Sequence, residues 1–471
     1  MKNKMPFLCA MCGALMGVCV LLSDVGFLTL FFGVLPLYAI SKGQTLKQKW
    51  IFSLLFCLPF CAVGYSPAFC ITTTLPPILN YLALSGVFLL ITLLHGTVLS
   101  LSLFAAYSLP AFSGVRALYV AVFWAGAEWI LGAGPFGWPT LRLALSLYKY
   151  PSLFQGARLG GILFVSGFII GFCALLAEAV AAFKGKRRII LSFVAVVLFV
   201  SNLVLGAFSQ TAPEGERKIS LVQSGVTVID WQRGDVYSQT LDIMKNAEDA
   251  ELFVLPESIL PTVFENHPVY KSEWEYALSG KNGDVLVGGR KDGHSAVFHL
   301  RGGEIIKISQ KSREVPFFEN GYGGREFYFL PREYDGIFDT DIGRVGTMLC
   351  YESLFSSVAR EAVKRDADIL AVLTNDSWFS HPIAKEIHLA HSVYRAAESG
   401  RAVLQSGLDG KTALIDNRGV IIAVVPHGQD AVLSEKVSAK AEDTLYNIIG
   451  DFWLIPAFFA VFVLALLKRG K

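Results

Sequence analysis

The feature that most constrains this chain is the uneven distribution of its charged residues. Residues 1–208 contain 13 basic and 3 acidic residues, whereas residues 209–451 contain 25 basic and 36 acidic residues. The first part is far below the roughly 25% charged residues of ordinary soluble proteins, and the second part reaches that level. We therefore predict a membrane-embedded domain over 1–208 and a soluble domain over 209–451. The chain has no long basic run of the kind that is typical of nucleic-acid-binding proteins.

Apolar segments in the first part are candidates for membrane-spanning helices, which need about 20 mostly apolar residues. Seven candidates precede the soluble domain and an eighth follows it, at 6–22, 25–40, 51–71, 79–109, 115–132, 160–182, 189–208 and 452–467. The sequence thus predicts a seven-helix transmembrane domain over 1–208 and an eighth transmembrane helix within 452–471. Residues 1–22 also resemble a signal peptide, but no small-residue cleavage pattern follows them, so we favour a retained helix.

Basic residues at alternate helix ends predict the orientation in the membrane. They are Lys2, Lys4, Lys42, Lys47, Lys49, Arg116, Lys184, Lys186, Arg187, Arg188, Lys468, Arg469 and Lys471. If every predicted helix spans the bilayer, all of these residues lie on one side, which the positive-inside rule makes cytoplasmic. The soluble domain then lies outside the cytoplasm. Its acidic balance does not oppose this orientation, because long domains are translocated regardless of charge.

The soluble part alternates short apolar strands with helices. Strands are predicted at 218–223, 252–256, 284–288, 295–300, 304–309, 343–349, 369–374, 402–406, 412–416 and 420–425. Helices are predicted at 234–250, 353–365 and 384–399. The fourth and fifth strands form a hairpin across Arg301-Gly302-Gly303. This mixture indicates an α/β fold with two packed sheets covered by helices.

Three residues at the ends of predicted strands are candidates for catalysis. Cys350, the one cysteine within 209–451, follows a strand where the chain turns into a helix, and helix amides there can stabilise a thiolate or an oxyanion. Glu257 could accept the thiol proton, and Lys311 could stabilise the negative charge that develops during attack. Together they suit acyl transfer, although each alone is equally compatible with a structural cysteine or a surface charge.

Further motifs surround these three residues. They are Leu255-Pro256-Glu257, Val315-Pro316-Phe317 with Glu319, Cys350-Tyr351-Glu352, Thr374-Asn375-Asp376-Ser377-Trp378-Phe379, Thr444-Leu445-Tyr446 with Gly450-Asp451, and Gln223 with Trp231. With the motifs, the Glu–Lys–Cys order resembles the nitrilase superfamily, whose fold is an αββα sandwich. More narrowly, almost the whole chain resembles the membrane branch of that superfamily, the apolipoprotein N-acyltransferase family.

The resemblance implies an N-acyltransferase of the bacterial inner membrane, with its catalytic domain on the periplasmic face. A phospholipid would give an acyl chain to Cys350 as a thioester. The N-terminal amine of the diacylglyceryl-cysteine of an apolipoprotein would then accept it as an amide. Glu257 would be the base and Lys311 the oxyanion stabiliser. The implied partners are the phospholipid donor, the lipoprotein acceptor and the bilayer, and the protein would act as a monomer without a cofactor.

The same resemblance implies supporting or substrate-binding roles for six residues, namely Glu319, Tyr351, Glu352, Trp231, Trp378 and Asn375. Glu319 would support Lys311 or the proton transfers, and Tyr351 and Glu352 would shape the thioester pocket. The two tryptophans would gate or line the lipid entry, with interfacial anchoring as the alternative. Phe318 stands where the family has a glycine, and the Ser406–Lys411 turn also departs from the family pattern, so substrate detail is less well defined than the triad.

Three other interpretations were weighed. His381, His388 and His391 could bind a metal, but their spacing matches no strong zinc motif, so we predict no metal site. A membrane-tethered nitrilase or amidase that hydrolyses a small amide is the alternative enzyme. A transporter or scaffold with a vestigial triad is the alternative without catalysis.

Overall fold

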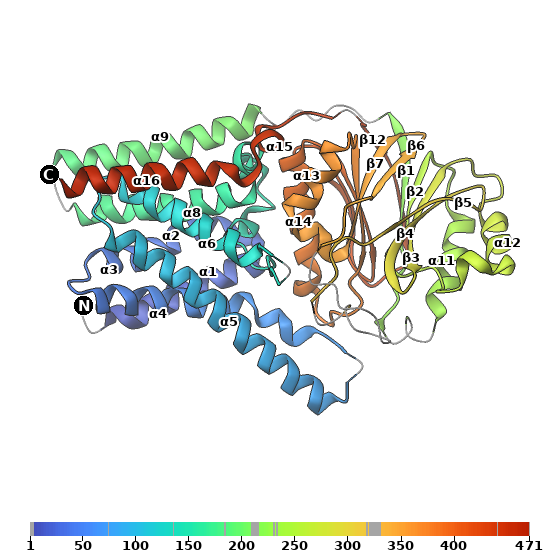
Figure 1. Cartoon of the computed structure of the whole chain (residues 1–471), viewed down its shortest axis with the longest axis horizontal. Helices are drawn as coiled ribbons and strands as arrows, with labels where there is room; N and C mark the ends of the chain where they lie inside the picture. The colour runs from blue at the N-terminus through green and yellow to red at the C-terminus, as the bar shows by residue number, and fades with distance from the viewer. Residues whose placement is uncertain are drawn as a thin grey trace.

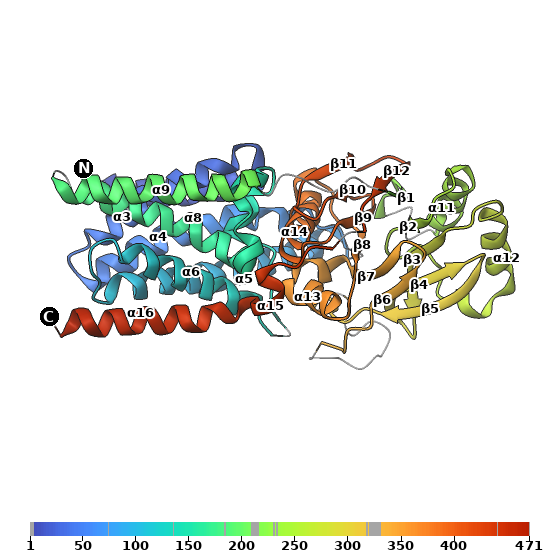
Figure 2. The same cartoon turned by 90° about the horizontal axis from the view of Figure 1, so that it is seen from above.

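The computed structural model describes residues 4–73, 75–134, 136–182, 185–208, 216–228, 231, 234–316, 319, 331–439 and 441–470. Within these residues the chain forms a helical bundle and an α/β sandwich that are placed end to end (Figure 1). Both chain ends lie at the end of the bundle that is remote from the sandwich (Figures 1 and 2).

The bundle consists of apolar helices. They are α1 (Met5–Leu21), α2 (Thr29–Phe32), α3 (Val34–Ser41), α4 (Leu46–Gly64), α5 (Pro77–Ser108), α6 (Arg116–Gly132), α7 (Pro151–Phe154), α8 (Ala157–Ala181), α9 (Lys186–Phe208) and α16 (Leu454–Arg469). Each of the eight predicted spans coincides with helix over most of its length, and the second, 25–40, is divided among a 3-10 helix (Ser23–Leu28), α2 and α3. Among the described residues, six helical stretches are long and apolar enough to cross a membrane: Ser23–Ser41, Leu46–Cys70, Pro77–Ser108, Ala157–Ala181, Lys186–Ala207 and Leu445–Arg469. α1 is apolar but shorter, and α6 is a helix of 17 residues.

Large apolar side chains cover the outer faces of this bundle. Phe193 on α9 is 66% exposed, and Phe462 on α16 is 60% exposed. A contiguous apolar surface of this kind marks a membrane contact, since water would penalise its exposure. The bundle therefore presents a lipid-compatible surface, as the composition of residues 1–208 predicted.

Two six-stranded sheets form the sandwich. The first has the order β12-β1-β2-β3-β4-β5, with β12 (Ala431–Val437), β1 (Arg217–Gln223), β2 (Leu252–Val254), β3 (Asp284–Lys291), β4 (His294–Arg301) and β5 (Glu304–Gln310). The second has the order β11-β10-β9-β8-β7-β6, with β11 (Ile421–Val425), β10 (Thr412–Ile415), β9 (Val403–Leu408), β8 (Ile369–Asn375), β7 (Gly343–Leu349) and β6 (Ile337–Thr340). The two sheets share a buried apolar core that includes Leu221, Val254, Val345 and Leu373.

Helices cover the outer face of each sheet. α11 (Asp235–Asn246) and α12 (Pro268–Ala277) lie on the first sheet, and α13 (Ser356–Lys364) and α14 (Pro382–Ser399) lie between the second sheet and the bundle (Figure 1). α15 (Leu445–Ile449) leads into α16. This arrangement confirms the predicted αββα sandwich beside a multi-pass helical domain. The helix predicted from Ser353 begins instead at Ser356, because residues Cys350–Leu354 form a 3-10 turn.

Strand direction determines where catalytic residues can gather. β1, β2 and β3 are parallel to one another, and so are β7, β8 and β9. Parallel strands end at the same edge of a sheet, so residues that follow them become neighbours. β8 is buried along its whole length, as its continuous apolar run requires of a central parallel strand.

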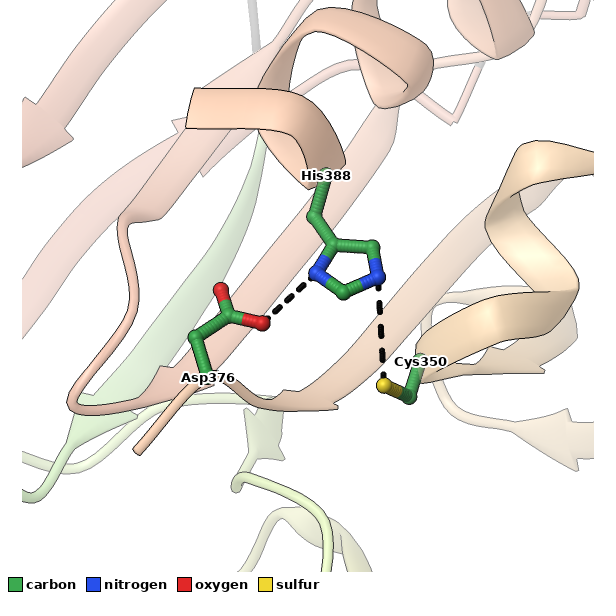
Figure 3. A group of neighbouring side chains, drawn as sticks. All are labelled: Cys350, Asp376 and His388. Atoms are coloured by element: carbon green, nitrogen blue, oxygen red, sulfur yellow. Dashed lines mark hydrogen bonds and ion pairs between the residues drawn. The ribbon is translucent and has the colours of Figure 1, made fainter. Parts of the chain in front are cut away.

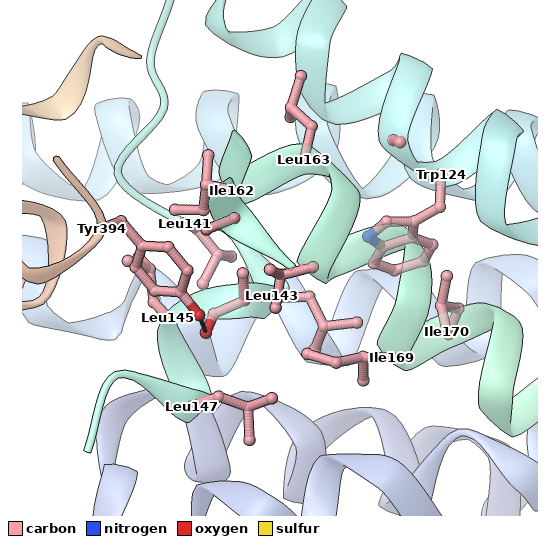
Figure 4. Close-up of a cluster of buried hydrophobic side chains, with 14 of the residues drawn as sticks. Trp124, Leu141, Leu143, Leu145, Leu147, Ile162, Leu163, Ile169, Ile170 and Tyr394 are labelled. Atoms are coloured by element: carbon pink, nitrogen blue, oxygen red, sulfur yellow. Dashed lines mark hydrogen bonds between the residues drawn. The ribbon is translucent and has the colours of Figure 1, made fainter. Parts of the chain in front are cut away.

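Helix α14 fastens the sandwich to the bundle. The Tyr394 hydroxyl donates a hydrogen bond to the carbonyl oxygen of Ala144 (2.5 Å), in a buried cluster with leucines of residues 141–147 and side chains of α8 (Figure 4). The Glu398 carboxylate accepts a hydrogen bond from the Ile162 amide (2.6 Å). That amide is free of the helix ladder because α8 kinks at Gly161, whose φ is +73°. The second sheet is thereby held directly above the apolar bundle.

Candidate active site

Cys350 and Glu257 lie on strained turns at the ends of parallel strands. Cys350 directly follows β7 with φ +49°, and Ser258, beside Glu257, has φ +64°. These left-handed conformations are unfavourable for residues other than glycine, and they concentrate at functional sites. At Cys350 the turn takes the chain out of the sheet, since Leu349 is buried whereas Cys350 is half-buried.

Lys311 joins the site from the end of β5. Its Nζ lies 3.2 Å from Glu257 Oε1 and 2.8 Å from Glu319 Oε1. Lys311 is 1% exposed and Glu257 is 4% exposed, so the ions are shielded from water. Breaking such a buried pair by removing one partner is costly, because the other charge is left unpaired. The Cys350 thiol lies close enough to interact with both the Glu257 carboxylate and the Lys311 ammonium. The structure therefore brings together the three predicted catalytic residues and the predicted supporting residue Glu319.

The protonation of this network follows from burial and charge. Burial alone would lower the pKa of Lys311, but Glu257 and Glu319 hold that pKa well above its ordinary value. Burial raises the pKa of Glu257, and the opposing effect of Lys311 does not cancel it. Lys311 therefore stays cationic, and Glu257 is a stronger proton acceptor than an exposed carboxylate.

Glu352 connects the Lys311 segment to the Cys350 turn. Its Oε1 accepts hydrogen bonds from the Ser312 amide (2.7 Å), the Ser312 hydroxyl (2.5 Å) and the Arg313 amide (3.1 Å). Its Oε2 accepts one from the Leu349 amide (2.8 Å). Burial raises the pKa of Glu352, although these hydrogen bonds oppose the shift. The carboxylate therefore holds the segment after Lys311 and the end of β7 in register.

Tyr351 and the two tryptophans connect the site to the membrane-side loops. The Tyr351 hydroxyl donates to the carbonyl oxygen of Gly137 (2.5 Å). The rings of Trp231 and Trp378 meet edge to face with centroids 5.2 Å apart. Trp231 Nε1 donates to the carbonyl oxygen of Ser258 (3.2 Å), and the Trp378 carbonyl accepts from the Thr72 amide, between α4 and α5 (2.7 Å).

Asn375 shapes the turn that carries Trp378. Its Oδ1 accepts hydrogen bonds from the Ser377 amide (3.1 Å) and the Ser377 hydroxyl (2.6 Å). Its effect on the site is therefore through this turn. Phe317, which matches the family motif, and Phe318, which departs from it, both lie outside the described residues.

His388, to which the sequence assigned no catalytic role, also reaches the thiol, and Asp376 holds its imidazole. His388 Nε2 lies 3.8 Å from Cys350 Sγ, and His388 Nδ1 lies 2.6 Å from Asp376 Oδ1 (Figure 3). Burial alone would lower the pKa of His388, but the Asp376 carboxylate holds it well above its ordinary value. Strand topology could have indicated Asp376, because it follows β8 next to β7. The sequence presents His388 only as one of three candidate metal ligands.

The same three side chains place a sulfur, a carboxylate oxygen and an imidazole nitrogen within 4.8 Å of one another, a spacing that a metal ion could also use. Catalytic zinc sites hold the metal through about three protein ligands. Here Asp376 already binds the far nitrogen of His388, which leaves two donors facing each other. His381 is exposed at the start of α14, and His391 is buried one turn beyond His388. We interpret the group as a hydrogen-bonded chain.

Comparisons with known proteins cover both parts of the molecule. Residues 12–176 match the model of the apolipoprotein N-acyltransferase N-terminal domain, and residues 218–444 match the carbon-nitrogen hydrolase model. The chain is 28% identical to an apolipoprotein N-acyltransferase of Geobacter metallireducens over 74% of this chain and 73% of that one. It is 25% identical to one of Thermotoga maritima over 95% and 92%. The crystal structure of an amidase from a Nesterenkonia species aligns with 53% of this chain and 99% of its own, at 16% identity and a TM-score of 0.39.

Proposed function

We propose that this chain, as a member of the apolipoprotein N-acyltransferase family, transfers an acyl chain from a phospholipid to the N-terminal amine of a diacylglyceryl lipoprotein. The acyl chain would be carried as a thioester on Cys350. As a member of this family, the protein is a membrane acyltransferase of the nitrilase superfamily, as its sequence predicted. The observation that carries the finer proposal is the convergence of Cys350, Glu257 and Lys311 at one edge of the sandwich.

In the first half-reaction, Glu257 accepts the proton of the Cys350 thiol while the sulfur attacks the ester carbonyl of the phospholipid. The carbonyl oxygen becomes an oxyanion, which the buried Lys311 ammonium stabilises. As the carbon–oxygen bond breaks, the leaving alkoxide takes the proton from Glu257 and departs as a lysophospholipid. The product is a thioester, and the acid–base residue has returned to its initial state.

In the second half-reaction, the α-amine of the lipoprotein attacks the thioester carbonyl. Glu257 accepts the amine proton, Lys311 again stabilises the oxyanion, and the carbon–sulfur bond breaks to give the amide. Glu257 then returns the proton to the departing thiolate. This two-step scheme is the usual consequence of a covalent nucleophile. Glu319 would keep Lys311 oriented, and Glu352 and Tyr351 would hold the walls of the site.

The position of the site suits two substrates that carry membrane-bound chains. The second sheet rests on the apolar bundle, and the loop of Trp378 contacts the segment between α4 and α5. We propose that the sandwich, over residues 209–451, lies on the extracytoplasmic face of the inner membrane, between the spans of 1–208 and 452–471. An impermeant label added from outside should modify the sandwich, and modification only from the cytoplasmic side would contradict this placement.

Mass spectrometry of the purified protein tests the chemistry directly. After incubation with phospholipid, the wild type should gain the mass of one acyl chain on Cys350, and a lipopeptide amine should remove it as an amide. Cys350→Ser should show neither step, because a serine hydroxyl has a far higher pKa than a thiol. Acyl transfer that persists in Cys350→Ser would exclude Cys350 as the nucleophile.

Hydrolysis of a small amide is the competing activity, since residues 218–444 match the carbon-nitrogen hydrolase model. Ammonia release from soluble amides, without acyl transfer to a peptide amine, would support that alternative. The lipid-compatible bundle beside the site favours the transferase.

A further inference from the structure

We propose that His388 is a further catalytic residue, whose imidazole, held by Asp376, donates a hydrogen bond to the sulfur of Cys350 and stabilises the thiolate in both half-reactions. The inference rests on the proposed role of Cys350 as nucleophile. It adds a second cationic group, after Lys311, to the Glu257–Lys311–Cys350 arrangement, on the side of the second sheet.

The two nitrogens of His388 have different partners. Nδ1 faces Asp376 Oδ1 at 2.6 Å, and Nε2 faces Cys350 Sγ at 3.8 Å, within the range of a hydrogen bond to sulfur (Figure 3). Thr374 Oγ1 also donates to Asp376 Oδ1 (2.9 Å), which fixes that carboxylate. Because a carboxylate holds Nδ1, the imidazole can present an Nε2–H to the sulfur.

Three elements determine where this imidazole points. Cys350 follows β7, Asp376 follows the parallel neighbour β8, and His388 lies on α14, which covers the same sheet. Asp376 and His388 are both buried. The contact is therefore built by the core of the second sheet rather than by exposed loops.

Charged and titratable groups surround the imidazole from several elements. Those that act on it are Asp376 after β8, Cys350 after β7 and His391 on the next turn of α14. Glu257 and Lys311, from the first sheet, act on the same thiol, and Lys385, one turn before His388 on α14, is paired with Asp409 (2.7 Å). Asp376 is the carboxylate in direct contact with the imidazole, so it favours the cationic form of His388. The stabilisation of the thiolate is present while His388 is protonated, and it is lost as the pH rises through the pKa of His388.

The chemistry balances without an additional reactant. When Glu257 accepts the thiol proton, negative charge develops on the sulfur next to the Nε2–H of His388. The same hydrogen bond forms again when the carbon–sulfur bond of the thioester breaks and the thiolate leaves. His388 keeps its proton throughout, so proton transfer stays with Glu257 and charge stabilisation is shared by Lys311 and His388.

Alkylation of Cys350 by iodoacetamide measures the reactive thiolate without requiring substrate. The other seven cysteines lie in the bundle segments, and peptide mass spectrometry follows Cys350 separately from them. We compare the wild type with His388→Gln and Asp376→Asn in the full-length protein, between about pH 6 and about pH 9.5, a range that spans ordinary thiol ionisation. His381→Asn is the matched control, because His381 caps the same helix from an exposed position.

His388→Gln should slow alkylation of Cys350 about tenfold near pH 7, and the rates should converge with the wild type at alkaline pH, where the thiolate forms without help. Asp376→Asn should act in the same direction with a smaller effect, and His381→Asn should match the wild type. The lower thiolate reactivity should appear as slower formation of the acyl adduct.

Two results would overturn the inference. Equal alkylation of wild type and His388→Gln at every pH would show that the imidazole does not act on the sulfur. If His388→Gln lowers the alkylation rate of Cys350 by the same factor at every pH and also lowers the melting temperature, His388 only packs the core. Either result leaves the acyl adduct on Cys350 as a separate test, so failure of this inference is distinguishable from failure of the proposed function.

Discussion

Among the described residues of the sandwich, two buried aspartate–histidine pairs lie at opposite ends of its strands. Asp284 begins β3 and lies 2.7 Å from His299, whereas Asp376 follows β8 and lies 2.6 Å from His388. Asp284 also accepts hydrogen bonds from Arg301 (2.8 Å) and from the amide of Asp341, in the turn between β6 and β7 (2.9 Å). The first pair therefore ties one sheet to the other.

The second pair differs in what its histidine faces. The outer nitrogen of His388 meets the sulfur of Cys350, whereas His299 lies beside the aromatic ring of Phe338 (5.9 Å between ring centroids). The Asp284–His299 pair thus joins the two sheets, whereas the Asp376–His388 pair is placed to act on the thiol. A buried aspartate–histidine pair does not by itself indicate a catalytic role. The distinguishing feature is the group that faces the histidine on the side away from the aspartate. The predictions below test this division between the two ends.

Lys311→Ala and Glu257→Gln should give the largest effects among them. Lys311→Ala should lower the rate of thioester formation by about 10²–10³, because it removes an oxyanion-stabilising group. Glu257→Gln should also block thioester formation, since it removes the proton acceptor. Stopped-flow mixing with a fluorescent phospholipid donor, followed by detection of the acyl adduct, measures both. Lys311→Ala that acylates at the wild-type rate would refute the assigned role.

Lys307→Ala is the matched control for this prediction. Lys307 lies on the same strand, β5, and pairs with Asp335 on the surface (2.8 Å). Exposed ion pairs contribute at most about 1 kcal/mol, so this variant should acylate at the wild-type rate. A loss as large as that of Lys311→Ala would mean that β5 itself, and not the buried ammonium, controls the reaction.

Asp284→Asn should reduce stability and leave thioester formation unchanged. Burial alone would raise the pKa of Asp284, but hydrogen bonds from His299 and Arg301 lower it to about 2. The unfolded-state pKa is about 3.9, so ionised Asp284 contributes about 2–3 kcal/mol to the free energy of unfolding at neutral pH. That contribution is fully present above about pH 4 and is lost as the pH falls toward 2.

Thermal unfolding of the wild type and the variant at neutral and acidic pH measures this contribution. Asp284→Asn should unfold at a lower temperature near pH 7, and the gap should close on acidification, because the wild-type carboxylate becomes neutral there. Asp341→Asn changes an exposed carboxylate at the same junction and serves as the control. If the difference in melting temperature between wild type and Asp284→Asn stays constant with pH, the packing of the Asp284 side chain, rather than its charge, makes the first pair stabilising.

Sequence patterns predicted the part of the site that depends on strands. The apolar run Gly343–Leu349 has the observed bounds of β7, and Lys311 was expected where β5 ends. The edge strand β12 was not predicted, because its Ser434-Glu435-Lys436 segment is polar and its pairing with β1 is long-range. The contact of His388 with Cys350 depends on how α14 lies across the sheet, which hydrophobic periodicity does not specify.

The smallest expected effect concerns the lipid side of the site, where Trp378 lies half-buried against Trp231. If this pair lines the path of the acyl chain, Trp378→Ala should slow turnover of a long-chain phospholipid by about tenfold, since it removes apolar surface from the tail's binding site. A short, water-soluble ester donor has little tail to bind, so its turnover should change much less.

The comparison of the two donors separates lipid contact from structural support. The Trp378 carbonyl binds the Thr72 amide through the backbone, so alanine keeps that tie to the bundle and changes only the ring. Truncating a fully buried tryptophan would cost about 3–5 kcal/mol and impair both donors equally. Equal losses together with a lower melting temperature would therefore assign Trp378 to the core, as Asp284 is assigned. If Trp378→Ala turns over both donors at the wild-type rate and keeps the wild-type melting temperature, Trp378 neither contacts the lipid nor supports the core. Only a loss that grows with the length of the donor's acyl chain places the ring on the path of the lipid, at the same end of the strands as Cys350 and His388.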